Sequence, residues 1–207
     1  MRRSAMLALL LAAACAPHAS GQAAPAADST RARPAAGDSS RSFGTLSQTD
    51  LALRMRSEEL EIRFVPLNER VTRLLAPDAW QSLRGLRAGR QTSIDSLARL
   101  YGLSDPGLAL VTFYAQRDGA RFDPQLLTLV SRGRFLRPVG VVPLSPGFTS
   151  QQLPQRGQAM AIFLYEEVIP VDESFTLTYD TLTSEDWERK LPMLERERAR
   201  VSSRMNR

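Results

Sequence analysis

The chain has 207 residues, of which 43% are hydrophobic, 24% charged and 7% aromatic, and its formal net charge is +5. This balance excludes a chain that is disordered throughout, a collagen-like rod and a protein with many membrane spans. The only cysteine, Cys15, and the only histidine, His18, both lie near the N-terminus. Beyond them, the sequence excludes a Ser-His-Asp triad, a Cys-His pair and a zinc site with His or Cys ligands.

The positive charge of the chain is small and is distributed along its length. All of its basic residues are arginine except Lys190. Residues 1–46, 47–140 and 141–207 carry net charges of +3, +4 and −2, and acidic residues are interleaved with the arginines. A nucleic-acid-binding protein usually concentrates its excess charge on one face or element. The charge pattern therefore predicts no nucleic-acid partner.

The first residues have the order of a secretory signal peptide. Arg2 and Arg3 form a positive start, an apolar run over 5–14 follows, and Cys15 ends it. The run is too short for a membrane-spanning helix, which needs roughly 20 apolar residues. This segment resembles a bacterial lipoprotein precursor, in which the Cys that ends the lipobox is acylated and becomes the mature N-terminus. The match is incomplete, since Ala12 stands where the family usually has Leu.

The resemblance implies a signal peptide over residues 1–14, lipidation at Cys15 and export to the outer membrane or periplasm. Ala16 replaces the Asp that the family uses for retention in the inner membrane, which points to the outer membrane. The alternative is ordinary cleavage after Gly21, which would remove Cys15 and leave a soluble periplasmic protein. Residues 15–47 are rich in Ala, Pro, Ser and Gly, show no apolar periodicity and are expected to form a flexible tether.

Residues 48–104 are predicted to form a strand and a small helical subdomain. Apolar and charged side chains alternate over 59–65, which indicates a half-buried strand. Three helices are expected next, each bounded by a capping residue, a proline or a glycine. They run from Asn68 to Leu75, from Pro77 to Gly89, and from Ser93 to Tyr101 ahead of Gly102.

Residues 105–182 are predicted to form antiparallel strands. Apolar runs recur at short spacing, with Gly133 at a hairpin position and a long Pro- and Gly-containing loop over 143–158. The predicted strands cover 108–115, 126–131, 135–142, 159–165 and 175–179. This pattern favours an antiparallel sandwich or barrel over a parallel sheet. The region 111–187, with Phe122-Asp123-Pro124 before a strand, loosely resembles an immunoglobulin-like sandwich, which implies a fold and no function.

Residues 183–207 are predicted to form an amphipathic helix, capped by Thr183 or Ser184 and kinked or restarted at Pro192. Its apolar positions fall four and three apart, at Trp187, Leu191, Leu194, Val201 and Met205, with Arg198 interrupting the stripe. We expect this stripe to close one side of the domain, with a partner-binding helix or a short coiled coil as alternatives. The polar face is expected to carry two weak ion pairs, Glu195 with Arg198 and Glu197 with Arg200.

Paired carboxylates are the remaining candidates for catalysis or metal binding. Glu166-Glu167 and Asp172-Glu173 flank the strand break at Pro170, and such pairs can bind calcium or act as acid and base. Neither the Asp-x-Asp-x-Asp spacing of a calcium loop nor sugar-stacking aromatic residues accompany them. We therefore interpret them as solubilising residues at a turn, and predict no catalytic residue, no metal site and no cofactor.

Two arginine clusters are candidates for contacting anionic lipid headgroups or lipopolysaccharide phosphates. They are Arg84, Arg87 and Arg90 on the helix after Pro77, and Arg132, Arg134 and Arg137 around a hairpin. We favour the simpler interpretation that both are solvated faces of an arginine-rich chain.

The sequence thus predicts an α+β protein in which a small N-terminal helical subdomain precedes a mainly antiparallel, immunoglobulin-like β-sandwich and a C-terminal helix closes the chain. It predicts a non-catalytic binding or scaffolding function in the cell envelope. The partners would be the membrane, through the N-terminal lipid, and an envelope protein. The loop 143–158 and the C-terminal helix are the expected contact surfaces. A soluble periplasmic subunit of a membrane assembly and a carboxylate-based envelope hydrolase stay open as alternatives.

Overall fold

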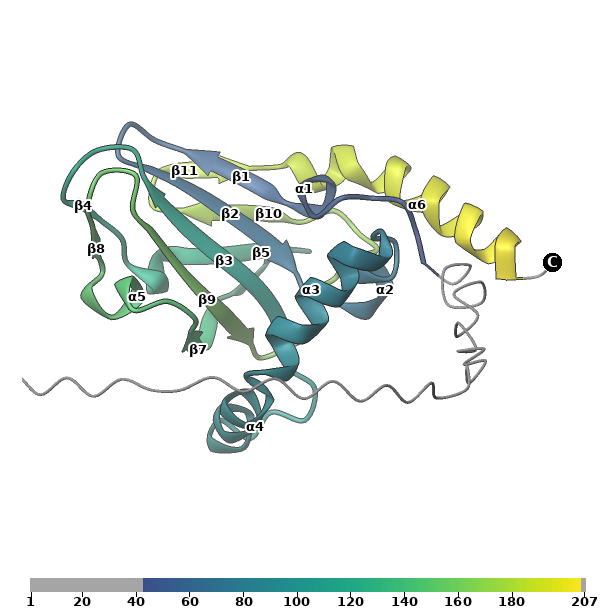
Figure 1. Cartoon of the computed structure of the whole chain (residues 1–207), viewed down its shortest axis with the longest axis horizontal. Helices are drawn as coiled ribbons and strands as arrows, with labels where there is room; N and C mark the ends of the chain where they lie inside the picture. The colour runs from purple at the N-terminus through teal and green to yellow at the C-terminus, as the bar shows by residue number, and fades with distance from the viewer. Residues whose placement is uncertain (1–42, 206–207) are drawn as a thin grey trace, which may run out of the picture. The chain divides into compact units, whose positions relative to one another are not determined.

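The computed structural model describes residues 43–205, which form helices and antiparallel β-sheets (Figure 1). Sheets of five and four strands make a sandwich, and a two-stranded ribbon lies at one end. The predicted α+β fold built on antiparallel sheets is confirmed. Cys15 and the predicted signal peptide and tether lie almost wholly outside the described residues. Within 43–205, no helix is both long and apolar enough to cross a bilayer.

The larger sheet has the strand order β1-β2-β3-β9-β7, and every neighbouring pair is antiparallel. Its strands are β1 (Leu53–Arg56), β2 (Leu60–Pro66), β3 (Gly107–Ala115), β9 (Gln158–Tyr165) and β7 (Pro138–Pro143). The predicted alternation in β2 is confirmed, since Leu60, Ile62 and Phe64 are buried while Glu61 and Arg63 are only partly covered. One face of the sheet therefore forms the core.

The smaller sheet has the order β11-β10-β5-β6 and is also antiparallel. Its strands are β11 (Leu182–Ser184), β10 (Thr176–Tyr179), β5 (Leu127–Ser131) and β6 (Arg134–Leu136). A short ribbon pairs β4 (Ala120–Arg121) with β8 (Gln152–Leu153). Between β4 and β5, Asp123 caps a turn of 3₁₀-helix by accepting a hydrogen bond from the N–H of Gln125 at 2.8 Å.

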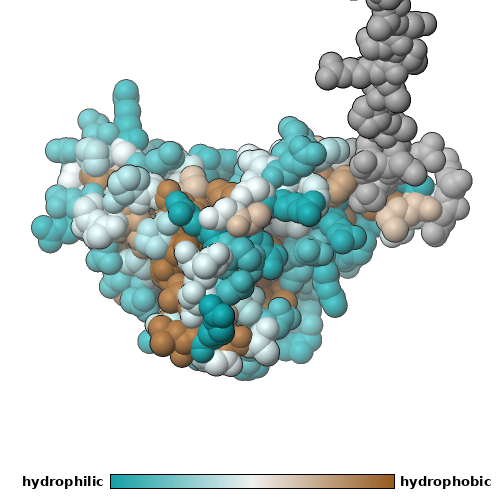
Figure 2. All heavy atoms as spheres, turned by 60° about the horizontal axis from the view of Figure 1, so that its bottom comes forward, coloured by the Kyte–Doolittle hydropathy of each residue, from teal (hydrophilic) through white to brown (hydrophobic). Residues whose placement is uncertain are grey.

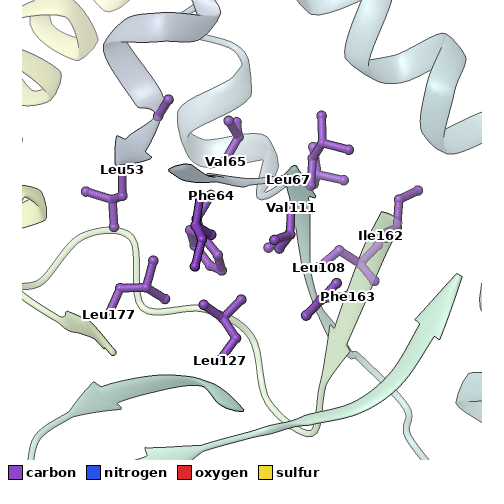
Figure 3. Packing of buried hydrophobic residues seen from close by; sticks show 14 of the residues in the cluster. Leu53, Phe64, Val65, Leu67, Leu108, Val111, Leu127, Ile162, Phe163 and Leu177 are labelled. Carbon is purple, nitrogen blue, oxygen red and sulfur yellow. The ribbon is translucent and has the colours of Figure 1, made fainter. Parts of the chain in front are cut away.

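The core lies between the two sheets (Figure 3). Leu53 and Phe64 of the larger sheet point toward Leu127 and Leu177 of the smaller one, and all four side chains are fully buried. Complete burial of a Leu or Phe side chain stabilises a fold by roughly 1.5–3 kcal/mol. These contacts, rather than any single element, hold the sandwich together.

Helices α3 (Pro77–Ala88) and α4 (Gln91–Leu100) lie beside the larger sheet, on the side away from the smaller one (Figure 1). Pro77 occupies the first turn of α3, where its missing N–H would have no helical partner in any case. Gly89 follows α3, and Gly102, with φ of +67°, follows α4 as predicted. The short helices are α1 (Gln48–Leu51), α2 (Glu69–Thr72) and α5 (Gly147–Ser150).

The C-terminal helix α6 (Asp186–Met205) buries its apolar stripe against the domain. Trp187 is fully buried, and its indole N–H donates a hydrogen bond to the carbonyl oxygen of Val171 at 3.3 Å. Leu194 and Val201 continue the buried stripe. The prediction of a helix that closes one side of the domain is therefore confirmed.

Two strand boundaries differ from the sequence prediction. The predicted strand 135–142 is two strands, β6 and β7, which belong to different sheets because the chain crosses between the sheets at Arg137 and Pro138. The predicted loop 143–158 contains α5 and β8 and is not irregular throughout. Strands β1, β4 and β11 have two to four residues each, too few for a periodic pattern to indicate them.

The start of α6 and the division of the domain also differ. Ser184 ends β11, so α6 begins only at Asp186, and Pro192 lies inside one continuous helix. The segments 48–104 and 105–182 contribute to the same sheet, because β2 pairs with β3 over seven residue pairs. All described residues fall in one compact unit.

Candidate functional site

The carboxylates around Pro170 are held by arginines from distant parts of the chain. The pairs are Glu167 with Arg134, Glu173 with Arg132, and Asp172 with both Arg70 and Arg198. Since these side chains are largely exposed, each pair contributes at most about 1 kcal/mol. Among residues 43–205, no three His, Cys, Asp or Glu side chains gather where they could hold a metal ion. Three of the four carboxylates that flank Pro170 thus form surface ion pairs.

The arginine cluster at the β5–β6 hairpin supplies two of these pairs. Arg132 and Gly133 form a two-residue turn, and both have left-handed φ values, of +51° and +75°. This geometry matches the twist of an antiparallel hairpin, and glycine adopts it without strain. Arg132 and Arg134 face the acidic segment after β9, so their charges are already compensated within the domain.

The three arginines on and after α3 line two different sites. Arg84 and Arg87 line a pocket beside Trp80, whereas Arg90 lines a separate groove next to α4. The Arg84 guanidinium lies over the Trp80 ring, with its carbon 4.9 Å from the ring centroid. These three residues therefore do not form one continuous basic face.

Four loops meet in a cleft of about 860 Å³, which we call the loop-end cleft. It is lined by the β1–β2 turn, the segment after β4, the α5–β8 connection and the β10–β11 turn, including Glu58, Glu59, Phe122, Asp123, Gln151, Gln152, Tyr179 and Asp180. The β1–β2 turn and the β4–β8 ribbon lie at the end of the domain opposite the first described residues (Figure 1). Part of the predicted contact loop 143–158 therefore forms one wall of this cleft.

The inner wall of the loop-end cleft is fixed by aromatic residues. Phe122 stacks on Phe113 with 4.4 Å between ring centroids. The Tyr179 hydroxyl oxygen accepts a hydrogen bond from the backbone N–H of Asp123 at 2.9 Å, which ties the segment after β4 to β10. Burial raises the pKa of Tyr179 above its ordinary value, so the ring stays neutral at physiological pH.

The rim of the cleft carries negative charge. Gln151 and Asp180 have left-handed φ values of +51° and +50°. Asp180 begins the two-residue β10–β11 turn, where this conformation is usual, as it is for Arg132 in the β5–β6 turn. The rim also carries more carboxylates than cations, with Arg121 as the single basic residue of the lining among the described residues. A ligand or partner with a basic group fits this charge.

A buried carboxylate joins α6 to the first described residues. The side chain of Glu197 is 2% exposed and accepts hydrogen bonds from the N–H of Thr45 at 2.8 Å and from its hydroxyl at 3.0 Å. Arg200 forms an ion pair with the same carboxylate. The predicted Glu197–Arg200 pair exists, but it lies against the domain and not on an exposed charged face. The prediction that Glu195 pairs with Arg198 is wrong, because Arg198 reaches Asp172 instead.

The only lysine of the chain also connects α6 to the N-terminal part of the described residues. The Lys190 ammonium group donates a hydrogen bond to the carbonyl oxygen of Asp50 at 2.8 Å. Partial burial lowers the pKa of Lys190, and the neighbouring Asp50 and Asp186 oppose that shift. Lys190 thus links α6 to α1.

Exposed hydrophobic side chains are scattered over the described surface. The large ones are Leu100, Tyr101, Leu126, Phe135, Val168 and Met205, of which Leu100 and Tyr101 lie together at the end of α4 and the others lie in separate segments. On the face shown in Figure 2, hydrophobic residues form small groups between hydrophilic ones. Scattered exposed apolar residues of this kind are common on folded domains, and one of them, Leu126, lines the loop-end cleft.

No family model, no curated protein and no solved structure matches this chain. The sequence indicated Phe122 and Asp123 only as part of a fold pattern and Gln151 only as part of the predicted contact loop 143–158. It carried no signal for Tyr179 or Asp180, which the strand pairing brings to the same site. Cys15, the one predicted site residue, lies outside the described residues.

Proposed function

We propose that the protein is an exported cell-envelope protein, lipid-anchored at Cys15, whose domain binds an envelope protein through the loop-end cleft and catalyses no reaction. The observation that supports this most is the placement of the cleft. Four loops form it at the end of the domain away from residue 43, through which any N-terminal anchor is attached. Loops held by a rigid sandwich are a common position for binding sites.

The lining suggests the chemistry of the partner. Carboxylates predominate at the rim, and the Phe122 and Tyr179 rings lie beneath them. A protein segment with an exposed Arg or Lys next to an apolar side chain matches both features. The hydrolase alternative needs two carboxylates that converge on a substrate, whereas three of the four predicted for it, Glu167, Asp172 and Glu173, are engaged by arginines.

Intact mass spectrometry of the protein from membranes of its native host tests the anchor. We expect a mass that begins at Cys15 and includes acyl chains, and we expect Cys15→Ser to abolish acylation. A mature N-terminus at Gln22 would contradict the anchor and favour the soluble periplasmic form. The proposal for the cleft would then still stand, because it depends on a different part of the chain.

Site-specific crosslinking tests the cleft. A photoreactive residue replaces Gln152, which lines the cleft, or Gln81, an exposed residue of α3 that serves as the control. We expect one dominant envelope protein to crosslink through position 152 and not through position 81. The double substitution Glu59→Gln and Asp180→Asn should weaken this crosslink, whereas Glu166→Gln with Glu188→Gln, outside the cleft, should leave it unchanged. Equal crosslinking at both positions would refute the cleft as the binding surface.

A further inference from the structure

A second pocket lies at the opposite end of the domain, between α2 and α3. Its volume is about 370 Å³, and it is lined by Phe43, Leu67, Glu69, Thr72, Arg73, Trp80, Leu83, Arg84 and Arg87. We call it the arginine–aromatic pocket. On α3, Trp80, Leu83, Arg84 and Arg87 follow one another at spacings of one to four residues that place them on one helix face.

The wall of this pocket is aromatic. The Phe43 and Trp80 rings contact each other with 4.4 Å between centroids, and the Arg84 guanidinium lies against Trp80. Leu67 and Leu83 are buried at the same site. A ligand in the pocket would therefore meet apolar surface next to the cationic groups.

The charge of the pocket is not balanced within the domain. Three arginines face one carboxylate, that of Glu69, which lies 3.4 Å from Arg73. Among residues 43–205, the guanidinium groups of Arg84 and Arg87 form no ion pair, in contrast to Arg132 and Arg134 at the hairpin. Counted over the described residues, the pocket therefore holds an excess of about two positive charges, and the N–H donors of Arg84 and Arg87 have no acceptor among these residues.

We propose that the arginine–aromatic pocket binds a phosphate monoester. A phosphate monoester carries about −1.5 to −2 charges at pH 7, which matches the excess, whereas a carboxylate or a phosphodiester supplies only about one. Guanidinium groups bind phosphate oxygens in pairs, with short charge-assisted hydrogen bonds. The volume holds a phosphate and a small organic group but no acyl chain, so the ester is either a soluble metabolite or the headgroup of a phosphomonoester lipid whose chains stay in the membrane.

Calorimetric titration of the full chain tests this proposal. The chain carries Cys15→Ser and is kept in nonionic detergent, so that an acyl anchor plays no part. The probes are glycerol 3-phosphate, phosphatidic acid in mixed micelles, and phosphatidylglycerol in the same micelles. We expect saturable binding of at least one monoester probe and at least tenfold weaker binding of the phosphodiester. Binding of glycerol 3-phosphate indicates a soluble ligand, and binding of phosphatidic acid alone indicates a lipid headgroup.

Matched variants separate the pocket from general charge attraction. Arg84→Gln with Arg87→Gln removes two charges from the pocket, and Arg90→Gln with Arg99→Gln removes two from outside it. We expect the first pair to weaken binding at least tenfold and the second to change it less than twofold. Equal weakening by both pairs, or no saturable binding of either monoester, would overturn the proposal. Thermal unfolding of each variant verifies that the fold is kept. A bound ligand should raise the unfolding midpoint of the parent chain and of the Arg90→Gln, Arg99→Gln variant, but not that of the Arg84→Gln, Arg87→Gln variant.

Discussion

Two buried tyrosines show how the environment of one hydroxyl group sets its contribution to stability. Tyr165 is fully buried between the sheets, and its hydroxyl has no hydrogen-bond partner among the described residues. Tyr179 is also buried, but its hydroxyl accepts the bond from Asp123. An unsatisfied buried polar group costs about 1–3 kcal/mol, whereas a formed hydrogen bond stabilises by about 1 kcal/mol.

The same chemical change should therefore have opposite effects at the two positions. We expect Tyr165→Phe to raise the free energy of unfolding by about 1 kcal/mol and Tyr179→Phe to lower it by about 1 kcal/mol. Urea unfolding followed by circular dichroism measures both. Destabilisation by Tyr165→Phe would mean that its hydroxyl has a partner, such as an internal water molecule.

Glu197 should contribute more than any exposed acid of α6. Glu197→Ala would leave the N–H of Thr45 without its partner and would remove the carboxylate from Arg200. Hydrogen bonds to a charged group are worth about 1.5–3 kcal/mol, so we expect a loss of about 2–3 kcal/mol in unfolding free energy. Glu195→Ala is the matched control, since Glu195 is exposed on the same helix and should change stability by less than about 0.5 kcal/mol. Equal effects of the two substitutions would show that the Thr45 contact does not hold the N-terminal segment to α6.

At the scale of elements, α6 contains an internal proline that works against its own stability. Pro192 has no N–H to donate to the carbonyl of Glu188, and a proline inside a helix costs about 3 kcal/mol relative to alanine. Alanine would restore this bond, while the more flexible unfolded chain would offset about 0.4–1 kcal/mol of the gain. We expect Pro192→Ala to raise the free energy of unfolding by about 2 kcal/mol, measured by thermal and urea unfolding. A loss of stability instead would mean that a bend at Pro192 is needed to seat Leu194 in the core.

Local patterns predicted those elements whose signal lies within a few residues. Alternation in β2, the proline that opens α3 and the glycine of the β5–β6 turn each act at short range, so the sequence alone indicates them. The apolar run 135–142 looked continuous, although Pro138 could have marked the division, because proline fits the first position of a strand. Glu197 lies three residues after Leu194 and four before Val201, so the helical spacing already placed it at the buried stripe.

The candidate sites could not be predicted in the same way, because long-range pairing creates them. The loop-end cleft needs β4 to pair with β8 and β5 to pair with β10, which joins residues about 30 and about 50 positions apart in the chain. Likewise, the partners of Glu167 and Glu173 lie more than 30 residues away on the β5–β6 hairpin. The sequence supplied the residue types, but only the sheet order determines which of them meet.

At the scale of the whole molecule, the sheet order makes the domain one folding unit. β1 and β2 come from residues 48–104, yet β2 lies beside β3 in the larger sheet, and its Phe64 is at the centre of the core. A fragment 105–207 would expose the open edge of β3 and would lose the Leu53 and Phe64 side chains that cover Leu127 and Leu177. The burial of these large side chains is worth several kcal/mol, which is comparable to the whole stability of a small domain.

We therefore expect the full chain to unfold in a single transition, with coincident curves from tryptophan fluorescence and far-ultraviolet circular dichroism. Trp80 lies in α3 and Trp187 in α6, so fluorescence reports on both halves of the domain. We also expect fragment 105–207 to be degraded rapidly by protease under conditions in which the full chain resists it. A stable fragment, or two separate transitions of the full chain, would show that the helices of residues 48–104 form an independent subdomain. In that case, ligand binding in the arginine–aromatic pocket would raise the midpoint of only that transition in which the subdomain of residues 48–104 unfolds.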